Sequence, residues 1–348
     1  MERGDVETNE RKRRAVPRWM QLLIAVALGC LVSVQARVSA GLAERSDVYS
    51  AAWVTVITGT LILLVIIVAS PHARRGFGSV ASAVRTRSLP WWALFGGLAG
   101  MFFVITQGTA AGVLGLAMFG MAVVAGQVVG GLVFDWIGIA GGERRSPTLF
   151  RVLGSVLAIA AVSFGAIAGD DSNIDFALIA MAFVAGLGLA AASGATGRVQ
   201  SASRSVVTAG MLNHLVGLIV IVTLLVITAP GDFTRFSLPT EPWLFLGGII
   251  GPIGVAVGAI LVHSLGVLLL GLGMVAGQLI GALILELVVP TAGVQASSLI
   301  GIALTLVAVA VTSLDGRRQR AREEQRKSAA DSRRARPINA SEANGASA

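Results

Sequence analysis

A long internal repeat constrains the fold of this chain more than any other feature of its sequence. The stretch Trp92–Asp135 matches the stretch Trp243–Glu286 without a gap, 151 positions later. The glycines keep their spacing, and the letters Val-Ala-Gly-Gln recur at Val124–Gln127 and Val275–Gln278. Each copy lies in strongly apolar sequence. We therefore predict two related halves that share one architecture.

The composition places both halves in a membrane. Apolar residues occupy 55% of 348 positions and charged residues 13%, whereas a soluble domain carries about 25% charged residues. The charges lie between apolar runs of about 20 residues, which as helix cross about 30 Å of hydrocarbon. The predicted fold class is an all-α polytopic membrane protein with ten transmembrane helices. We place these helices at about 20–41, 49–69, 91–110, 113–135, 150–168, 175–197, 206–229, 243–262, 265–289 and 294–314.

The basic residues predict the orientation, because cytoplasmic loops are enriched in Lys and Arg. With the N-terminus inside, the inner segments carry Arg3, Arg11–Arg14, Arg18, Arg74, Arg75, Arg85, Arg87, Arg144, Arg145, Arg151, Arg198, Arg204 and the tail from Arg317. The predicted outer loops are acidic instead, with Glu44, Asp47, Asp170, Asp171, Asp175, Asp232 and Glu241. We therefore expect a multi-pass protein of a bacterial inner (plasma) membrane, with both termini cytoplasmic.

The two halves should lie antiparallel, because five helices per half is an odd number. The charges agree. The predicted loop before Trp92 holds four Arg, whereas the loop before Trp243 holds Arg235 with two acids. The matching loops of the two halves thus carry opposite charge, as expected if they lie on opposite faces of the membrane, which is typical of inverted-topology repeats. The predicted units are a basic cytoplasmic tail at 1–18, five-helix repeats at 19–168 and 175–314, and a basic disordered tail at 315–348.

Two glutamines are the predicted substrate-binding residues. Gln127 and Gln278 occupy matching positions near the middle of the predicted helices 113–135 and 265–289. A neutral amide at that depth needs a partner on another helix, in water or in a ligand. The alternative is a hydrogen bond that only joins two packed helices, worth about 0.6 kcal/mol.

Three ionisable residues are candidates for gating or proton coupling. Asp135 and Glu286 end matching helices, so one approaches the inner interface and the other the outer interface. They act either as gates, one at each face, or as ordinary interfacial acids. His214 lies within the predicted helix 206–229 and titrates near neutral pH in its ordinary range. Its alternative is a buried His that bonds to Asn213 or to a backbone carbonyl.

The glycines of the repeat predict close helix packing. Small residues on one face let a neighbouring backbone approach, and a proline inside a helix introduces a kink. Hinge motion is the second interpretation of these positions. The residues in question are Gly96, Gly97, Gly100, Gly126, Gly130, Gly247, Gly248, Gly251, Pro252, Gly277 and Gly281.

No catalytic pattern is visible in the sequence. It contains no phosphate-binding loop, no nucleotide fingerprint and no nucleophile with a matching base. A single Cys30 allows no intramolecular disulfide, and no metal-ligand cluster occurs. We predict neither an enzyme nor a cofactor or metal, and the positive charge follows the topology rule rather than nucleic-acid binding.

The stretch from Val124 to Gly138, followed by Pro147 and Arg151, resembles the YdcZ-like branch of the bacterial drug/metabolite transporter superfamily. That branch is related to the small multidrug resistance proteins. Its members have one five-helix unit, and this chain resembles two such units fused over about residues 19–314. The resemblance implies a transporter-like fold and membrane residence.

The second unit departs from the family pattern. It has Glu286 where the first has Asp, and it lacks the Pro and Arg signature in the next loop. Gln35 is retained near the end of the first helix, but Ser39-Ala40 replaces the family's Asn-Gly and Thr196-Gly197 stands at the matching place. No residue matches the first-helix Glu of the small multidrug resistance proteins.

These observations predict a secondary transporter for a small metabolite or amphipathic compound. Two inverted repeats would rock about a central site and give alternating access. The expected partners are the lipid bilayer and a small-molecule substrate, and the sequence leaves the oligomeric state open. The alternative is a membrane scaffold or partner-binding subunit that keeps the fold without transport.

Overall fold

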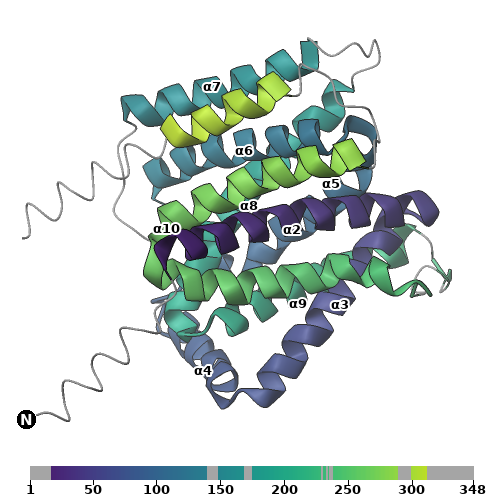
Figure 1. The fold of residues 1–348 in the computed structure, drawn as a ribbon. Coiled ribbons are helices and arrows are strands. Elements are labelled where there is room, and N and C mark those ends of the chain that lie inside the picture. Colours follow the sequence, from purple (N-terminus) through teal and green to yellow (C-terminus); the bar gives the residue numbers. More distant parts are fainter. Residues whose placement is uncertain are drawn as a thin grey trace, which may run out of the picture.

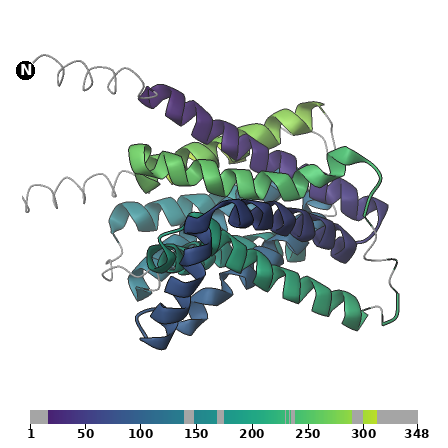
Figure 2. The same ribbon diagram turned by 90° about the horizontal axis from the view of Figure 1, so that it is seen from below.

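The structure is a computed structural model that describes residues 17–138, 148–167, 175–228, 230–232, 234, 238–288 and 299–311. Within these residues all regular structure is helical, which confirms the predicted all-α class. Most helices lie side by side along one direction (Figures 1 and 2). The two predicted tails, apart from residues 17 and 18, lie outside the described residues.

The helices follow one another in the same order in both halves, except for an additional helix, α4, in the first. The first half contains α2 (Arg18–Arg45), α3 (Val48–Ala69), α4 (Pro71–Arg85), η1 (Trp91–Phe95), α5 (Gly96–Leu114), α6 (Leu116–Ile137) and α7 (Leu149–Ile167). The second contains α8 (Phe176–Ser203), α9 (Val206–Thr228), η3 (Pro242–Phe245), α10 (Leu246–Val288) and a helix at Leu299–Val311. Eight spans of the described chain are long and apolar enough to cross a membrane, and Pro242–Gly258 and Leu299–Val311 are shorter apolar helices.

The predicted break between helices 243–262 and 265–289 is wrong at the level of secondary structure. The backbone stays helical over all 43 residues of α10. A straight helix of that length would measure about 65 Å, roughly twice the thickness of the hydrocarbon core. The matching junction in the first half is a true break, because Gly115 adopts a positive φ of 77° between α5 and α6.

Contacts with α2 show that α10 nevertheless doubles back. Gly247 lies against Val38, near the end of α2, whereas Gly273 lies against Ala25, near its beginning. The chain then returns along α2 to Gly281. Figure 1 shows this reversal at the end of the bundle where α2 begins. We call the part of α10 that starts at Leu246 its first limb and the part that ends at Val288 its second limb. The two limbs thus lie where the two separate helices were predicted.

The core surrounds α6, whose side chains from Met121 to Ala125 are completely buried. They pack against α5, α7, α8 and the second limb of α10. Lipid is as apolar as these side chains, so the fit between helices stabilises the bundle more than removal from water does. Close approach therefore depends on small residues at the crossings.

Two crossings bring backbones into direct contact. A Cβ added at Gly126 of α6 would overlap the carbonyl oxygen of Phe183 in α8. A Cβ added at Gly277 of α10 would overlap the carbonyl oxygen of Val26 in α2. We call these contacts the α6–α8 seam and the α10–α2 seam. They explain why the repeat keeps both glycines.

The segment with Arg74 and Arg75, predicted as an inner loop, is the helix α4. Its first turn is capped by the Ser70 hydroxyl, which accepts a hydrogen bond from the Ala73 N–H at 3.3 Å. Ala73 and Val80 are buried, whereas Arg74 and Arg75 are exposed. The charges that indicated a loop lie on the exposed face of an amphipathic helix.

Candidate functional site

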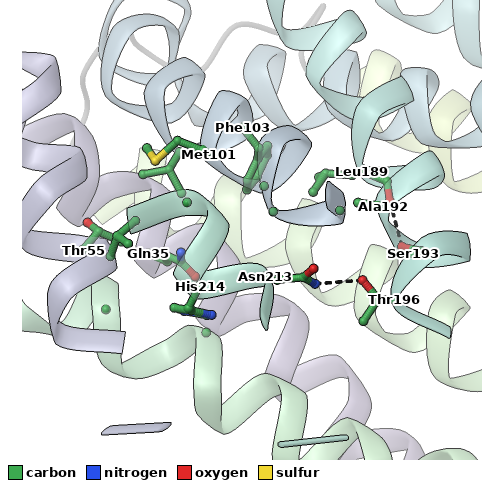
Figure 3. Close-up of a pocket in the computed structure, with 18 of the residues that line it drawn as sticks. Gln35, Thr55, Met101, Phe103, Leu189, Ala192, Ser193, Thr196, Asn213 and His214 are labelled. Carbon is green, nitrogen blue, oxygen red and sulfur yellow. Dashed lines mark hydrogen bonds between the residues drawn. The ribbon is translucent and has the colours of Figure 1, made fainter. Parts of the chain in front are cut away.

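A cavity of about 440 Å³ lies where the two halves meet. Its walls come from α2, α3 and α5 of the first half, and from α8, α9 and the first limb of α10 (Figure 3). Its volume falls in the range of small-molecule pockets, about 300–1,000 Å³. The lining includes Gln35, Thr55, Gly100, Met101, Phe103, Leu189, Ala192, Ser193, Thr196, Gln200, Asn213, His214 and Gly251.

Glycines of the repeat open the cavity. Gly100 of α5 and Gly251 of α10 occupy matching positions in the repeat, and a Cβ at either would meet only open space within 4 Å. Gly97 and Gly248 lie one turn earlier and are packed tightly against α9 and α3. In both α5 and α10 the earlier glycine allows close contact with a neighbouring helix, and the glycine one turn later leaves room for a ligand.

A hydrogen bond in the wall of the cavity joins α9 to α8. Asn213 Nδ2 donates to Thr196 Oγ1 at 2.8 Å, as Figure 3 shows. Asn213 Oδ1 lies 3.0 Å from the place of a Cβ at Gly96, so a side chain there would crowd the amide. The bond fixes the amide with its oxygen available as an acceptor.

His214 is oriented by its own helix. Its Nδ1 lies 3.1 Å from the carbonyl oxygen of Gly210. A carbonyl oxygen only accepts, so Nδ1 carries the hydrogen, and in the neutral ring Nε2 is left as an acceptor. Nε2 lies 2.7 Å from the place of a Cβ at Gly59 of α3. The predicted carbonyl bond is present, and the residue also lines the cavity.

Two hydroxyl groups of the wall donate back to their own helices. Thr55 Oγ1 donates to the Ala51 carbonyl at 3.0 Å, and Ser193 Oγ donates to the Leu189 carbonyl at 2.8 Å. The hydrogens are thus engaged, and the oxygens present lone pairs. No Asp, Glu, Lys or Arg occurs among the described residues that line the cavity.

The two predicted substrate-binding glutamines lie at the seams. The backbone nitrogen of Gln127 lies close to Gly186 of α8, and that of Gln278 lies close to Gly29 of α2. The carbonyl of Gln278 also accepts a hydrogen bond from Ser33. Neither glutamine lines the cavity. Their position matches the packing alternative, and the binding role stays a prediction.

Glu286 does not lie at a wet interface, as one interpretation of the sequence had it. It is only 3% exposed, and its carboxylate accepts a hydrogen bond from the Ala117 N–H at 3.2 Å. Ala117 belongs to the first turn of α6, whose free N–H groups favour a negative charge. Glu286 therefore caps α6 from the second half. The side chain of Asp135, its counterpart, lies outside the described residues.

The remaining glycines predicted for packing lie where tight packing requires them. A Cβ at Gly130 would approach α8, and one at Gly281 would approach α2. Pro252 is buried inside α10. A hinge role for any of these positions stays a prediction.

An arginine stacks on a tryptophan at each end of the bundle. At the end where α2 finishes, Arg45 lies 4.9 Å above the Trp243 ring and 3.3 Å from the Glu241 carboxylate. At the opposite end, Arg198 lies 5.1 Å above the Trp92 ring. We call these contacts the Arg45 contact and the Arg198 contact. Each joins the first helix of one half, α2 or α8, to the short 3-10 helix of the other half, η3 or η1.

Sequence reasoning missed both arginine contacts and the central role of Asn213. The match between Trp92 and Trp243 was the available signal, because both tryptophans start the repeated segment. Their partners lie in α2 and α8, outside the gapless repeat.

Comparison with known proteins places the sequence in a family. It matches the family described as "Putative inner membrane exporter, YdcZ" over residues 20–164 and again over 177–311. No curated protein matches it significantly. A solved structure titled "Crystal structure of protein" is 16% identical with a TM-score of 0.53, covering 86% of this chain and 97% of that chain, which is a likeness of fold. The two family matches cover one half each and confirm the resemblance seen in the sequence, so the chain belongs to the YdcZ family of inner-membrane proteins.

Proposed function

We propose that this protein is an inner-membrane secondary transporter that binds a small solute in the central cavity. Two five-helix repeats of opposite orientation, ten crossings in all, would rock about the cavity and expose it to each side in turn. Both termini would lie in the cytoplasm. In this proposal the two limbs of α10 would be the eighth and ninth crossings, and Leu299–Val311 would belong to the tenth.

The seams support the inverted repeat. Gly126 meets Phe183, and Gly277 meets Val26. The two glycines are 151 positions apart, and their two partners are 157 apart. In each case the fourth predicted crossing of one repeat, in α6 or the second limb of α10, packs on the first helix of the other repeat, α8 or α2. Reciprocal contacts of this kind are expected of two repeats related by a two-fold axis in the membrane plane.

The single observation that carries the proposal is the place of the cavity. The first three crossings of each repeat line it, and its open glycines, Gly100 and Gly251, are counterparts. Transporters built from inverted repeats hold their substrate at this interface, near the middle of the membrane. The Arg45 and Arg198 contacts lie at opposite ends and would close the two sides alternately.

A thiol-accessibility experiment tests the proposal. In a Cys30→Ala background, Ala192→Cys places a thiol in the cavity wall, and Val124→Cys places one in the core, where the native side chain is 0% exposed. We expect a membrane-impermeant maleimide to label position 192 from both faces of sealed vesicles and to leave position 124 unlabelled.

Gly100→Leu provides the second arm of that experiment. A Cβ at this position meets no neighbour within 4 Å, and the rest of the leucine would extend into the cavity, so labelling at position 192 should fall while the protein stays folded. No labelling at position 192 from either face would instead indicate a dry membrane scaffold. Labelling from one face only would contradict alternating access.

A further inference from the structure

The cavity also indicates a class of substrate, an inference that rests on the proposed transport function. We propose that the cavity takes an uncharged solute that combines an apolar body with N–H or O–H donors. One donor binds Nε2 of His214, where it competes with a proton.

The wall offers several acceptors whose own hydrogens are already engaged, beside the amides of Gln35 and Gln200, which can donate as well as accept. Thr55 and Ser193 have used their hydroxyl hydrogens on their own helices. Asn213 holds one amide hydrogen on Thr196 and keeps its oxygen for a ligand. The Nδ1 hydrogen of His214 is likewise engaged, which leaves Nε2. A ligand that donates hydrogen bonds therefore finds acceptors at these four residues.

The charge of the wall opposes ions. A cation in a cavity of low dielectric loses its hydration and needs a carboxylate, and an anion needs Lys or Arg. The described residues that line the cavity contain neither. An uncharged solute loses far less hydration free energy on entry.

The apolar part of the wall favours a ligand that is not polar throughout. Met101 and Phe103 come from α5 and Leu189 from α8 (Figure 3). They lie in the same cavity as the acceptors. A flat apolar body with a donor group at one end satisfies both surfaces.

His214 couples such a ligand to protons by simple competition. With Nδ1 donating to Gly210, only Nε2 can take up a proton, and a protonated Nε2 no longer accepts. Among the described residues that line the cavity from α2, α3, α5, α8 and α10, no other side chain is titratable. The solute and a proton therefore exclude each other at one atom, which is the requirement for exchange of one against the other.

Four aromatic probes of nearly the same shape separate these features. Benzamide is uncharged with N–H donors, and N,N-dimethylbenzamide is uncharged without them. Benzamidine is the matching cation and benzoate the matching anion. Binding is measured by calorimetry on the full-length protein in lipid nanodiscs, with millimolar probe, at about pH 8 and about pH 4.5, the lower value well below the ordinary histidine range.

We expect benzamide to bind more tightly than the other three probes at the higher pH. Loss of one neutral hydrogen bond corresponds to a roughly three- to tenfold weaker affinity. The dimethyl probe should be weaker by about that factor, and benzamide itself should weaken by about that factor at the lower pH. Tighter binding of benzamidine or benzoate, or no benzamide binding, overturns the proposed substrate class.

His214→Gln tests the competition with a proton. The glutamine keeps an acceptor oxygen but does not titrate, so benzamide binding should persist and its pH dependence should vanish. His214→Leu, which has no acceptor, should weaken binding at both pH values. A pH dependence that survives in His214→Gln overturns the proton-binding role.

The outcomes separate this inference from the transport function. If benzamidine binds and Gly100→Leu abolishes its binding, the cavity remains the transport site and only the substrate class is wrong. If position 192 also resists thiol labelling, the transport function itself fails.

Discussion

The two seams of the molecule are near copies of each other, whereas the two walls of the cavity differ. In both seams a glycine of the fourth helix touches the backbone of the first helix of the other half. Gly126 on Phe183 repeats as Gly277 on Val26. Close packing in lipid requires a small residue at such a contact in either half.

The cavity walls show no such agreement. Gly59 of α3 faces the carbonyl of Gly248, and Gly217 of α9 faces that of Gly97. This correspondence relates α3 to α9 by 158 positions, so Asn213 corresponds to position 55 and His214 to position 56. Those positions hold Thr and Val. The α9 wall carries an amide and an imidazole where the α3 wall carries a hydroxyl and an alkyl group.

The difference separates scaffold from site. Contacts that hold the two halves together act equally on both and keep the sequence repeat. A ligand without two-fold symmetry needs two different walls, so the lining of the cavity is free to diverge. Residues that break the repeat within a symmetric frame are therefore better functional candidates than residues that keep it.

The largest predicted effect comes from the seams. Gly126→Val and Gly277→Val each force a side chain into a backbone carbonyl and should cost at least about 3 kcal/mol, so little folded protein should remain. Gly131→Val, whose Cβ would meet only open space, is the matched control. The measurement is the folded fraction and its thermal midpoint in mild detergent. Unequal losses in the two seam variants would contradict the equivalence of the seams.

A smaller loss of stability is expected at the cap of α6. Glu286→Ala removes the carboxylate that accepts from Ala117 and should lower the unfolding free energy by about 1 kcal/mol. Glu286→Gln keeps an acceptor oxygen and should lose less. Thermal unfolding of both variants measures the difference. Equal stability of Glu286→Ala and the parent protein would show that the cap contributes nothing.

The sequence predicted the scaffold well, because membrane helices carry strong signals. The predicted helix 49–69 lies one residue from α3, which spans Val48–Ala69. The repeat also predicted the packing glycines of both seams, Gly126 and Gly277, although not their partners. Hydrophobic runs and glycine spacing are local features, so a single sequence displays them fully.

The site was harder to predict, because depth in the membrane does not say which way a side chain faces. Gln127 and Gln278 lie near the middle of their predicted helices but at the seams, whereas Thr196 and Asn213 meet in the wall of the cavity. That meeting depends on how α8 packs on α9, which no local pattern records. The amphipathic α4 was missed for a related reason, since its charges outweighed its short apolar face.

The asymmetry of the walls leads to a prediction for binding. Asn213→Ala removes an acceptor and releases Thr196, so benzamide affinity should fall by about 1 kcal/mol, or roughly fivefold. Thr55→Ala, at the matching position of the other wall, should cause a smaller loss, because the Thr55 hydroxyl is bonded only within its own helix and its removal disturbs no contact between helices. Calorimetry on the two variants tests this order. Equal losses would mean that both walls serve the ligand alike.

The smallest predicted effects on stability come from the arginine contacts. Arg45 and Glu241 are each about half exposed, so their ion pair is screened, and with the Trp243 ring the contact contributes about 1 kcal/mol or less. Loss of this contact should change the access of water-soluble reagents to the cavity more than it changes the free energy of unfolding. Arg45→Ala should raise thiol labelling at position 192 from the outer face of the membrane.

Arg198→Ala should raise that labelling from the inner face instead, because Arg198 stacks on Trp92 at the other end of the bundle. Arg74→Ala, on the exposed face of α4, is the control for loss of a positive charge and should change neither rate. Salt should mimic Arg45→Ala in part, since it weakens an ion pair more than it weakens ring stacking. If both variants raise labelling from the same face, the Arg45 and Arg198 contacts do not close opposite sides of the cavity. The two-fold relation seen in the seams would then not hold for these two contacts.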